Sequence, residues 1–280
     1  MSANLKKYLK GIAYLLSIHL TALLLMTVFR LLFLFAVEDQ LTPDVHGDVG
    51  SYLTAFVRGL WFDNVIGCYL LLLPLVVMTI AGVAHYYRRP LFRFFTLFFS
   101  ITYALVFMAT AANIPYFAYF TKILNSSIWN WTDEGGTALG MMFGEASYYL
   151  YIFYFVAATA LFAFLVNRYS RFWECWLSRP RIRTGWKVWK SWTPVLAVGL
   201  PLIGLCLFGI RGRTGYNPIK VSAAYFCGNP ILNQLGVNPM FCLLTSTLDD
   251  FRPENRTLHL MNPQEAVTAT QQLLQRQGIE

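Results

Sequence analysis

The chain has 280 residues, of which 56% are hydrophobic, 17% aromatic and only 13% charged, and its formal net charge is +8. So high an apolar share with so few charges excludes an ordinary soluble domain and indicates an integral membrane protein. Most basic residues lie in short stretches beside long apolar runs, where they meet anionic lipid headgroups. We therefore expect membrane phospholipids as partners and no nucleic acid.

Five apolar segments are long enough to cross a hydrocarbon core, which needs about 20 helical residues. The first follows Lys6, Lys7 and Lys10, as in a secretory signal peptide, but it is too long and lacks a small-residue cleavage site. We expect it to be retained as a span. The predicted fold is an all-α transmembrane domain over residues 1–210, with spans near 12–37, 65–84, 91–112, 146–166 and 192–210.

The connections between these spans differ in charge, which predicts their orientation. Basic residues gather in residues 6–10, 88–93 and 168–190, whereas the connections of the other side hold only Arg58 and Lys122. Lys and Arg accumulate on the cytoplasmic side of a membrane, so we expect the N-terminus inside. Five spans then place the C-terminal tail, which begins at Arg211, outside.

The outer connection after the third span has a helical pattern. Its apolar side chains recur at helical spacing, Pro115 suits a first helical turn, and Gly135 and Gly136 suit a break. We expect an interfacial helix near residues 115–133, lying on the outer leaflet. A simple loop with scattered aromatic residues remains the alternative.

Ionisable groups inside a span are costly and need a partner or a function. Arg30 lies in the first span, about 10 Å from its outer end, and Asp63 begins the second span on the same side. One expectation is an Arg30–Asp63 ion pair that holds the two spans together. The other is that Arg30 binds a lipid phosphate, with Asp63 orienting it. His19, alone in mid-span, is interpreted as a packing residue.

Residues 211–280 are predicted to form an extracytoplasmic linker that is rich in Asn, Gly and Pro. Arg211 and Arg213 follow the fifth span directly; they either mark its end or add positive charge to a lipid-headgroup site. Cys227 and Cys242 could pair in an oxidising exterior or remain separate thiols. Residues 264–277 have helical composition, and no cysteine or histidine spacing in the chain predicts a metal site.

Several short motifs together resemble the sulfatase-like transferases typified by lipoteichoic acid synthase, which include phosphoglycerol and phosphoethanolamine transferases. None is specific alone, but their order and the five predicted spans cover nearly the whole chain. They lie at the start of span two, at the end of span three and in the tail: Phe56, Gly59, Leu60, Trp61, Phe62 and Asp63; Asn113 to Phe117; Arg211 to Arg213; Ser222 to Tyr225; Asn229-Pro230; Asn233 to Leu235; and Asn238 to Phe241.

The resemblance implies a bacterial inner-membrane enzyme whose helices anchor a large extracytoplasmic catalytic domain. That domain would use a Thr nucleophile and a divalent metal, Mn²⁺, Mg²⁺ or Zn²⁺, and its nucleophile and ligands are not expected in this chain. We expect the chain to be the membrane and linker portion of such an enzyme. The alternative is a non-catalytic membrane protein that positions lipid or a separate sulfatase-like subunit; a transporter is a weaker third.

Fold resemblance does not separate a transferase from a sulfatase or a phosphodiesterase. Nor does it identify the lipid donor or the acceptor. The predicted substrate-binding residues are Arg30, Asp63, Arg211 and Arg213.

Overall fold

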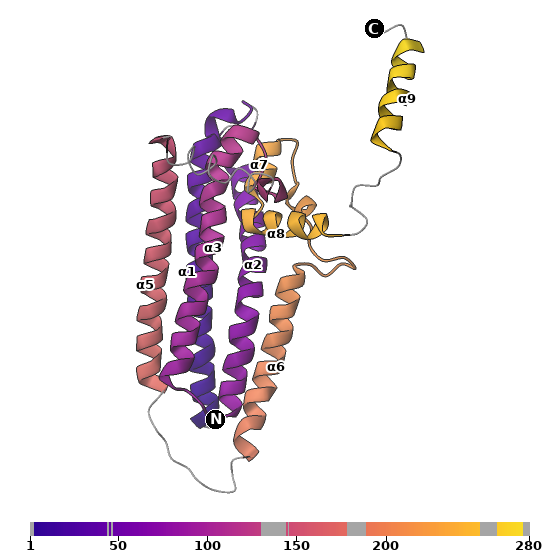
Figure 1. Ribbon diagram of the computed structural model, residues 1–280. Helices are drawn as coiled ribbons and strands as arrows, with labels where there is room; N and C mark the ends of the chain where they lie inside the picture. The colour runs from indigo at the N-terminus through magenta and orange to yellow at the C-terminus, as the bar shows by residue number, and fades with distance from the viewer. Residues whose placement is uncertain are drawn as a thin grey trace.

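The computed structural model describes residues 3–43, 45, 47–129, 144, 146–177, 189–252 and 262–276, and within them every regular element is helical. The long helices lie side by side as a bundle (Figure 1). Each is long and apolar enough to cross a membrane, which confirms the prediction of five apolar spans. They are α1 (Ala3–Val37), α2 (Val49–Val83), α3 (Arg89–Phe120), α5 (Tyr149–Leu177) and α6 (Trp189–Arg211).

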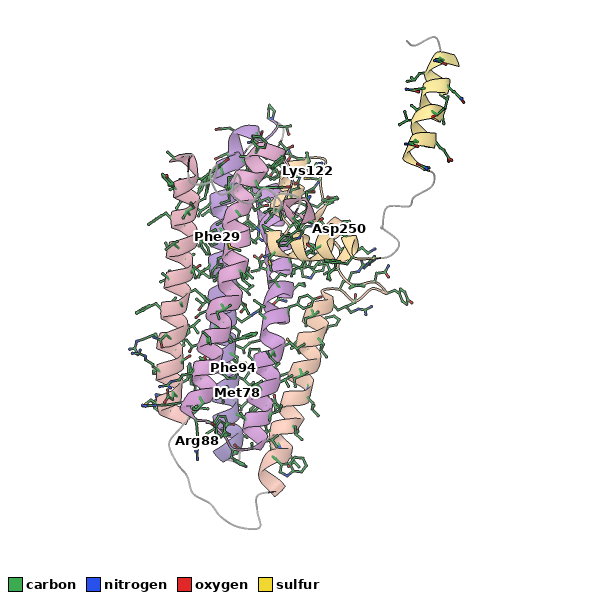
Figure 2. All side chains as sticks on the ribbon, viewed as in Figure 1. Phe29, Met78, Arg88, Phe94, Lys122 and Asp250 are labelled. Atoms are coloured by element: carbon green, nitrogen blue, oxygen red, sulfur yellow. The ribbon has the colours of Figure 1, made fainter. Side chains whose placement is uncertain are left out.

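The bundle has two ends of different character. Arg88 lies at the end that also holds the N-terminus, which we call the basic end, and Lys122 and Asp250 lie toward the opposite end, which we call the tail end (Figure 2). The basic stretch between α5 and α6 falls mostly in residues 178–188, which lie outside the described residues. The orientation of these ends in a membrane stays a prediction.

The first two helices are longer than the spans predicted for them. α1 and α2 have 35 residues each, hence about 52 Å of helix against a hydrocarbon core of about 30 Å. α6 is shorter and ends beside the middle of α2, where Trp61 Nε1 donates to the carbonyl of Gly212 at 2.6 Å. The second span was predicted near residues 65–84, but α2 begins at Val49. Hydropathy detects only the part of a helix that contacts lipid, and α2 continues beyond that part.

The connection after α3 corrects a second prediction. α3 runs without a break through Pro115 to Phe120, and Thr121, with a φ of 54°, ends it in the left-handed region. Residues 126–129 form a single 3-10 turn. The aromatic residues from 115 to 120 therefore belong to α3, so a separate helix near 115–133 is not found, and the part from 130 to 133 lies outside the described residues.

The helices of the bundle are joined by polar pairs and by close approaches at small residues. α1 contacts α2, α3, α5 and α6. Tyr14 on α1 bonds to Ser170 on α5 through their hydroxyls at 2.7 Å, which satisfies two polar groups within the bundle. α6 approaches α2 closely at Gly209, where a Cβ atom would lie 2.5 Å from Cys68 Sγ. Small residues of this kind allow helices in a membrane to pack without gaps.

After α6 the chain turns back and packs on the tail end of the bundle. α7 (Pro230–Leu235) contacts α1 and α2, and α8 (Pro239–Asp250) contacts α2 and α3. Each begins with an Asn-Pro pair, in which the Asn side chain caps the helix and Pro suits its first turn. We call residues 212–250 the docked tail.

The last helix, α9 (Pro263–Arg276), confirms the helix predicted for residues 264–277. It lies apart from the bundle in Figure 1. The described part of the predicted linker thus consists of two unlike regions, a tail that packs on the bundle and a helix beyond it.

Candidate functional site

The ion pair expected between the first two spans is present at the tail end of the bundle. Arg30 on α1 donates from Nη1 to Asp63 Oδ2 at 2.7 Å and from Nη2 to Asp63 Oδ1 at 2.9 Å. The side chains are 5% and 0% exposed. A planar guanidinium facing a carboxylate with two parallel bonds is the strongest geometry for such a pair. The predicted Arg30–Asp63 pair is confirmed.

Gly59 makes room for this pair. It lies one turn before Asp63 on the same face of α2, and a Cβ atom there would fall 2.1 Å from Arg30 Nε. Any side chain would therefore occupy the space of the guanidinium. In the sequence, the signal for this role is the spacing of four residues between Gly59 and Asp63, but the motif alone does not indicate what the glycine is for.

The same pair holds the docked tail. Arg30 Nε donates to the carbonyl of Leu235, the last residue of α7, at 3.0 Å. Asn238 Nδ2 donates to Asp63 Oδ1 at 2.7 Å, while Asn238 Oδ1 accepts from the backbone N–H of Phe241 and so caps α8. Arg30, Gly59, Asp63, Leu235 and Asn238 come from three helices and the cap of a fourth; we call them the clasp.

The clasp leaves little room for a ligand. Asp63 accepts three hydrogen bonds and Arg30 donates three, so both buried charges are compensated. The cavity beside them measures about 10 Å³, which is no more than one water needs. A phosphate could reach Arg30 only if the guanidinium left Asp63. The role of Arg30 and Asp63 in lipid binding stays a prediction that requires this opening.

Amide side chains attach the rest of the docked tail. Asn229 Nδ2 donates to Thr42 Oγ1 at 3.0 Å, beyond the end of α1. Gln234 Oε1 accepts from the backbone N–H of Ile123 at 3.0 Å, beyond the end of α3. Arg58 on α2 donates to the carbonyl of Ala223. The tail is therefore fixed to segments after α1 and α3 and to α2 itself.

The other two predicted site residues lie at the end of α6. Arg211 donates from Nη2 to the carbonyls of Gly215 and Tyr216, which closes the loop that follows the helix. Arg213 lies over Gly215 and makes no hydrogen bond or ion pair with any described residue. The structure thus brings Arg30 and Asp63 together and places Arg211 and Arg213 at a separate position near Trp61.

Neither a disulfide nor a metal-ligand set is found in the described part of the chain. Cys227 and Cys242 are free thiols, so the structure favours separate thiols over the pairing left open by the sequence. Burial raises the pKa of the Cys242 thiol to about 11. No group of three His, Cys, Asp or Glu side chains could hold a metal ion among these residues. The divalent metal that the resemblance implies was expected in a separate catalytic domain, and that expectation stays a prediction.

No family model matches this chain, and comparisons with curated proteins and with solved structures give no significant match. Function is therefore inferred from the geometry of the clasp and from the motifs of the sequence itself.

Proposed function

We propose that this chain is the membrane and linker portion of a sulfatase-like enzyme resembling lipoteichoic acid synthase. Such an enzyme transfers phosphoglycerol or phosphoethanolamine from a phospholipid to a cell-envelope acceptor. In this proposal the protein lies in a bacterial inner membrane, with the N-terminus inside and the docked tail outside. The observation that supports it most is the clasp, which fixes the chain after the last span to the bundle.

Two of the motifs that carry the resemblance are partners in the clasp. The motif at the predicted start of span two supplies Gly59 and Asp63, and the motif in the tail supplies Asn238. Their aromatic residues also meet, because the rings of Phe62 and Phe241 lie 5.0 Å apart edge to face. Motifs about 175 residues apart in sequence therefore form one structural unit, as expected of residues that act together.

A docked tail suits a headgroup transferase because the reacting phosphate lies at the membrane surface. A catalytic domain attached beyond α8, or a separate subunit bound there, would be held at a fixed height above that surface. Holding two reactants in the right geometry supplies a large part of many rate enhancements. The metal and the nucleophile would belong to that domain or subunit. The clasp would fix the position of the domain or subunit relative to the membrane.

The size of the native protein tests this proposal. An antibody raised against the docked tail should detect a product far heavier than 32.0 kDa in native membranes. Those membranes should release diacylglycerol from a phospholipid with a labelled headgroup, and Asn238→Leu should slow the release without lowering the amount of protein. A native product of about 32 kDa that copurifies with a sulfatase-like subunit would favour the positioning protein instead. A product of that size without such a subunit would contradict both.

A further inference from the structure

A groove on the side of the bundle is not used by the clasp. Its walls come from α1, α2 and α6, and its volume is about 380 Å³, within the range of small-molecule sites. It extends from Trp61 and Gly212 near the end of α6 to Leu75 and Leu202 deeper in the bundle. Fourteen residues of α2 separate Trp61 from Leu75, hence about 21 Å of depth.

The Nδ2 amide of Asn64, which lines the groove, has no hydrogen-bond partner among the described residues. The neighbouring His19 ring bonds to the oxygen of this side chain. Its Nδ1 is buried without a partner, so we assign the ring proton to Nε2, which then donates to Asn64 Oδ1 at 3.1 Å. The bond uses the oxygen of the Asn64 side chain and leaves its Nδ2 amide unpaired among the described residues. Asn64 is half-buried and lines the groove.

The chemistry of the groove changes in order with depth. Gly212 and Trp61 line its mouth. Arg211 and Arg213 are the sequence neighbours of Gly212; their side chains do not line the groove, and the Arg211 guanidinium donates to the carbonyls of Gly215 and Tyr216. Asn64 lies nearly one turn below Trp61, about 4.5 Å along α2. Apolar side chains such as Leu71 and Leu205 line the deeper part. Cation, amide donor and apolar wall follow each other as phosphate, ester carbonyl and acyl chain do in a phospholipid.

We propose that this groove binds one acyl chain of a membrane phospholipid, with the Asn64 amide donating to an ester carbonyl and the phosphate at the mouth beside Gly212, where the positive charges of the adjoining Arg211 and Arg213 attract it. In this groove α1, α2 and α6 would all contact the acyl chain. A lipid that lies on a single helix is contacted by protein on one side only. An arginine at the mouth suits a phosphate because its charge and its forked donors match the phosphate oxygens. The identity of this lipid as the donor of the headgroup rests on the proposed function; its binding does not.

Photocrosslinking tests the site in the unaltered protein. The full chain is placed in vesicles of phosphatidylglycerol that contain a trace of the same lipid with a diazirine in mid-chain. Labelling of the groove walls on α2 and α6 should exceed labelling of the exposed face of α5, near Phe153 and Phe164, by about tenfold. Labelling of the groove should fall when the proportion of unlabelled phosphatidylglycerol is raised, and glycerol phosphate should not lower it. Equal labelling of α5 would overturn the proposal.

A matched pair of variants on α6 separates this groove from the general lipid surface. Leu205 lines the groove and is 64% exposed, whereas Leu200 is 60% exposed on the same helix and does not line it. By native mass spectrometry, Leu205→Trp should reduce retained phosphatidylglycerol about tenfold, and Leu200→Trp should not.

Asn64→Leu should weaken retention of phosphatidylglycerol but not of a free fatty acid, which lacks the glycerol ester. If Leu205→Trp and Leu200→Trp retain lipid equally, no specific groove exists. Headgroup release that persists in that case would leave the proposed function intact, so the two failures are distinguishable.

Discussion

Gly59 leaves the space that the Arg30 guanidinium occupies at the tail end of the bundle. A methyl group there would fall within 2.1 Å of Arg30 Nε, so Gly59→Ala should displace the guanidinium and leave Asp63 buried without its cation. Breaking a buried pair costs about 3 kcal/mol, and we expect a loss of that order in the free energy of unfolding. The unfolding temperature of the purified protein, followed by tryptophan fluorescence, would measure it.

Gly204 is the matched control, because a Cβ atom at that position of α6 would meet nothing within 4 Å. Gly204→Ala should leave the unfolding temperature unchanged or raise it slightly, since alanine is the better helix former. An equal loss in both variants would show that Gly59 matters for helix flexibility and not for the space that it gives Arg30.

Cys242, on α8, reports whether the tail stays docked. Burial raises the pKa of its thiol to about 11, so at pH 8 only about one thiol in a thousand is the reactive thiolate. In a variant whose other cysteines are replaced by serine, its alkylation rate should rise about tenfold per pH unit up to pH 11. A rate that levels off near pH 8.5 would mean that the thiol is exposed and α8 is not packed as described.

At the scale of the helices, one amide side chain both caps α8 and joins it to α2. Asn238 caps α8 and donates to Asp63 at 2.7 Å, and it is 1% exposed. Asn238→Asp keeps the cap but sets a second carboxylate against Asp63, where two negative charges are strongly unfavourable without water. Hydrogen exchange of residues 230–250 should accelerate at least about tenfold at pH 7.

The control for this change is another helix cap. Asn262 accepts from Gln264 N at the start of α9 and is exposed, so Asn262→Asp adds a similar charge at a helix N-terminus, where it is favourable. Exchange in residues 230–250 should not change. Acidification should partly restore protection in Asn238→Asp, because the introduced carboxyl group, once protonated, can again donate to Asp63.

The five spans could be predicted because about 20 consecutive apolar residues seldom occur outside a membrane helix. Their ends could not. Hydropathy follows lipid contact, so it places the start of α2 near residue 65, whereas Asp48 caps the helix and starts it at Val49. The prediction for Pro115 failed for a related reason, since proline suits a first turn but is also tolerated inside a long helix that other contacts support.

Of the candidate site, the Arg30–Asp63 pair could be predicted from the sequence, but the docking of the tail onto it could not. Arg30 and Asp63 attract attention because charges in a span demand partners. The docking of the tail had a weaker signal: of the three Asn-Pro pairs in the docked tail, those at 229–230 and 238–239 start capped helices, whereas the pair at 217–218 does not. Which helix Asn238 contacts is a tertiary fact that no local pattern encodes.

At the scale of the whole molecule, the orientation in the membrane follows from charge and can be measured with thiols. Cys175 is exposed near the basic end, and Tyr216, in the loop after α6, is 96% exposed. With the other cysteines replaced by serine, Cys175 should react with a membrane-impermeant maleimide only in inverted vesicles. A Tyr216→Cys variant that also lacks Cys175 should react only in right-side-out vesicles. The opposite pattern would invert the predicted topology and place the clasp in the cytoplasm.

The different lengths of the helices determine where the membrane surface crosses the bundle. α6 ends beside Trp61, so residues 49–60 of α2 extend past it and should stand in water, together with the docked tail. Leu53 is 64% exposed on this extension, and Leu73 is 48% exposed about 30 Å further along the same helix.

In a variant without other cysteines, Leu53→Cys should therefore react with an aqueous maleimide, and Leu73→Cys should react only after the bilayer is dissolved, because a thiol in hydrocarbon does not ionise. If Leu53→Cys were also protected, the hydrocarbon would cover the clasp. Arg30 and Asp63 would then be buried within the bilayer, and their pairing would be needed to keep the protein in the membrane as well as to hold the tail.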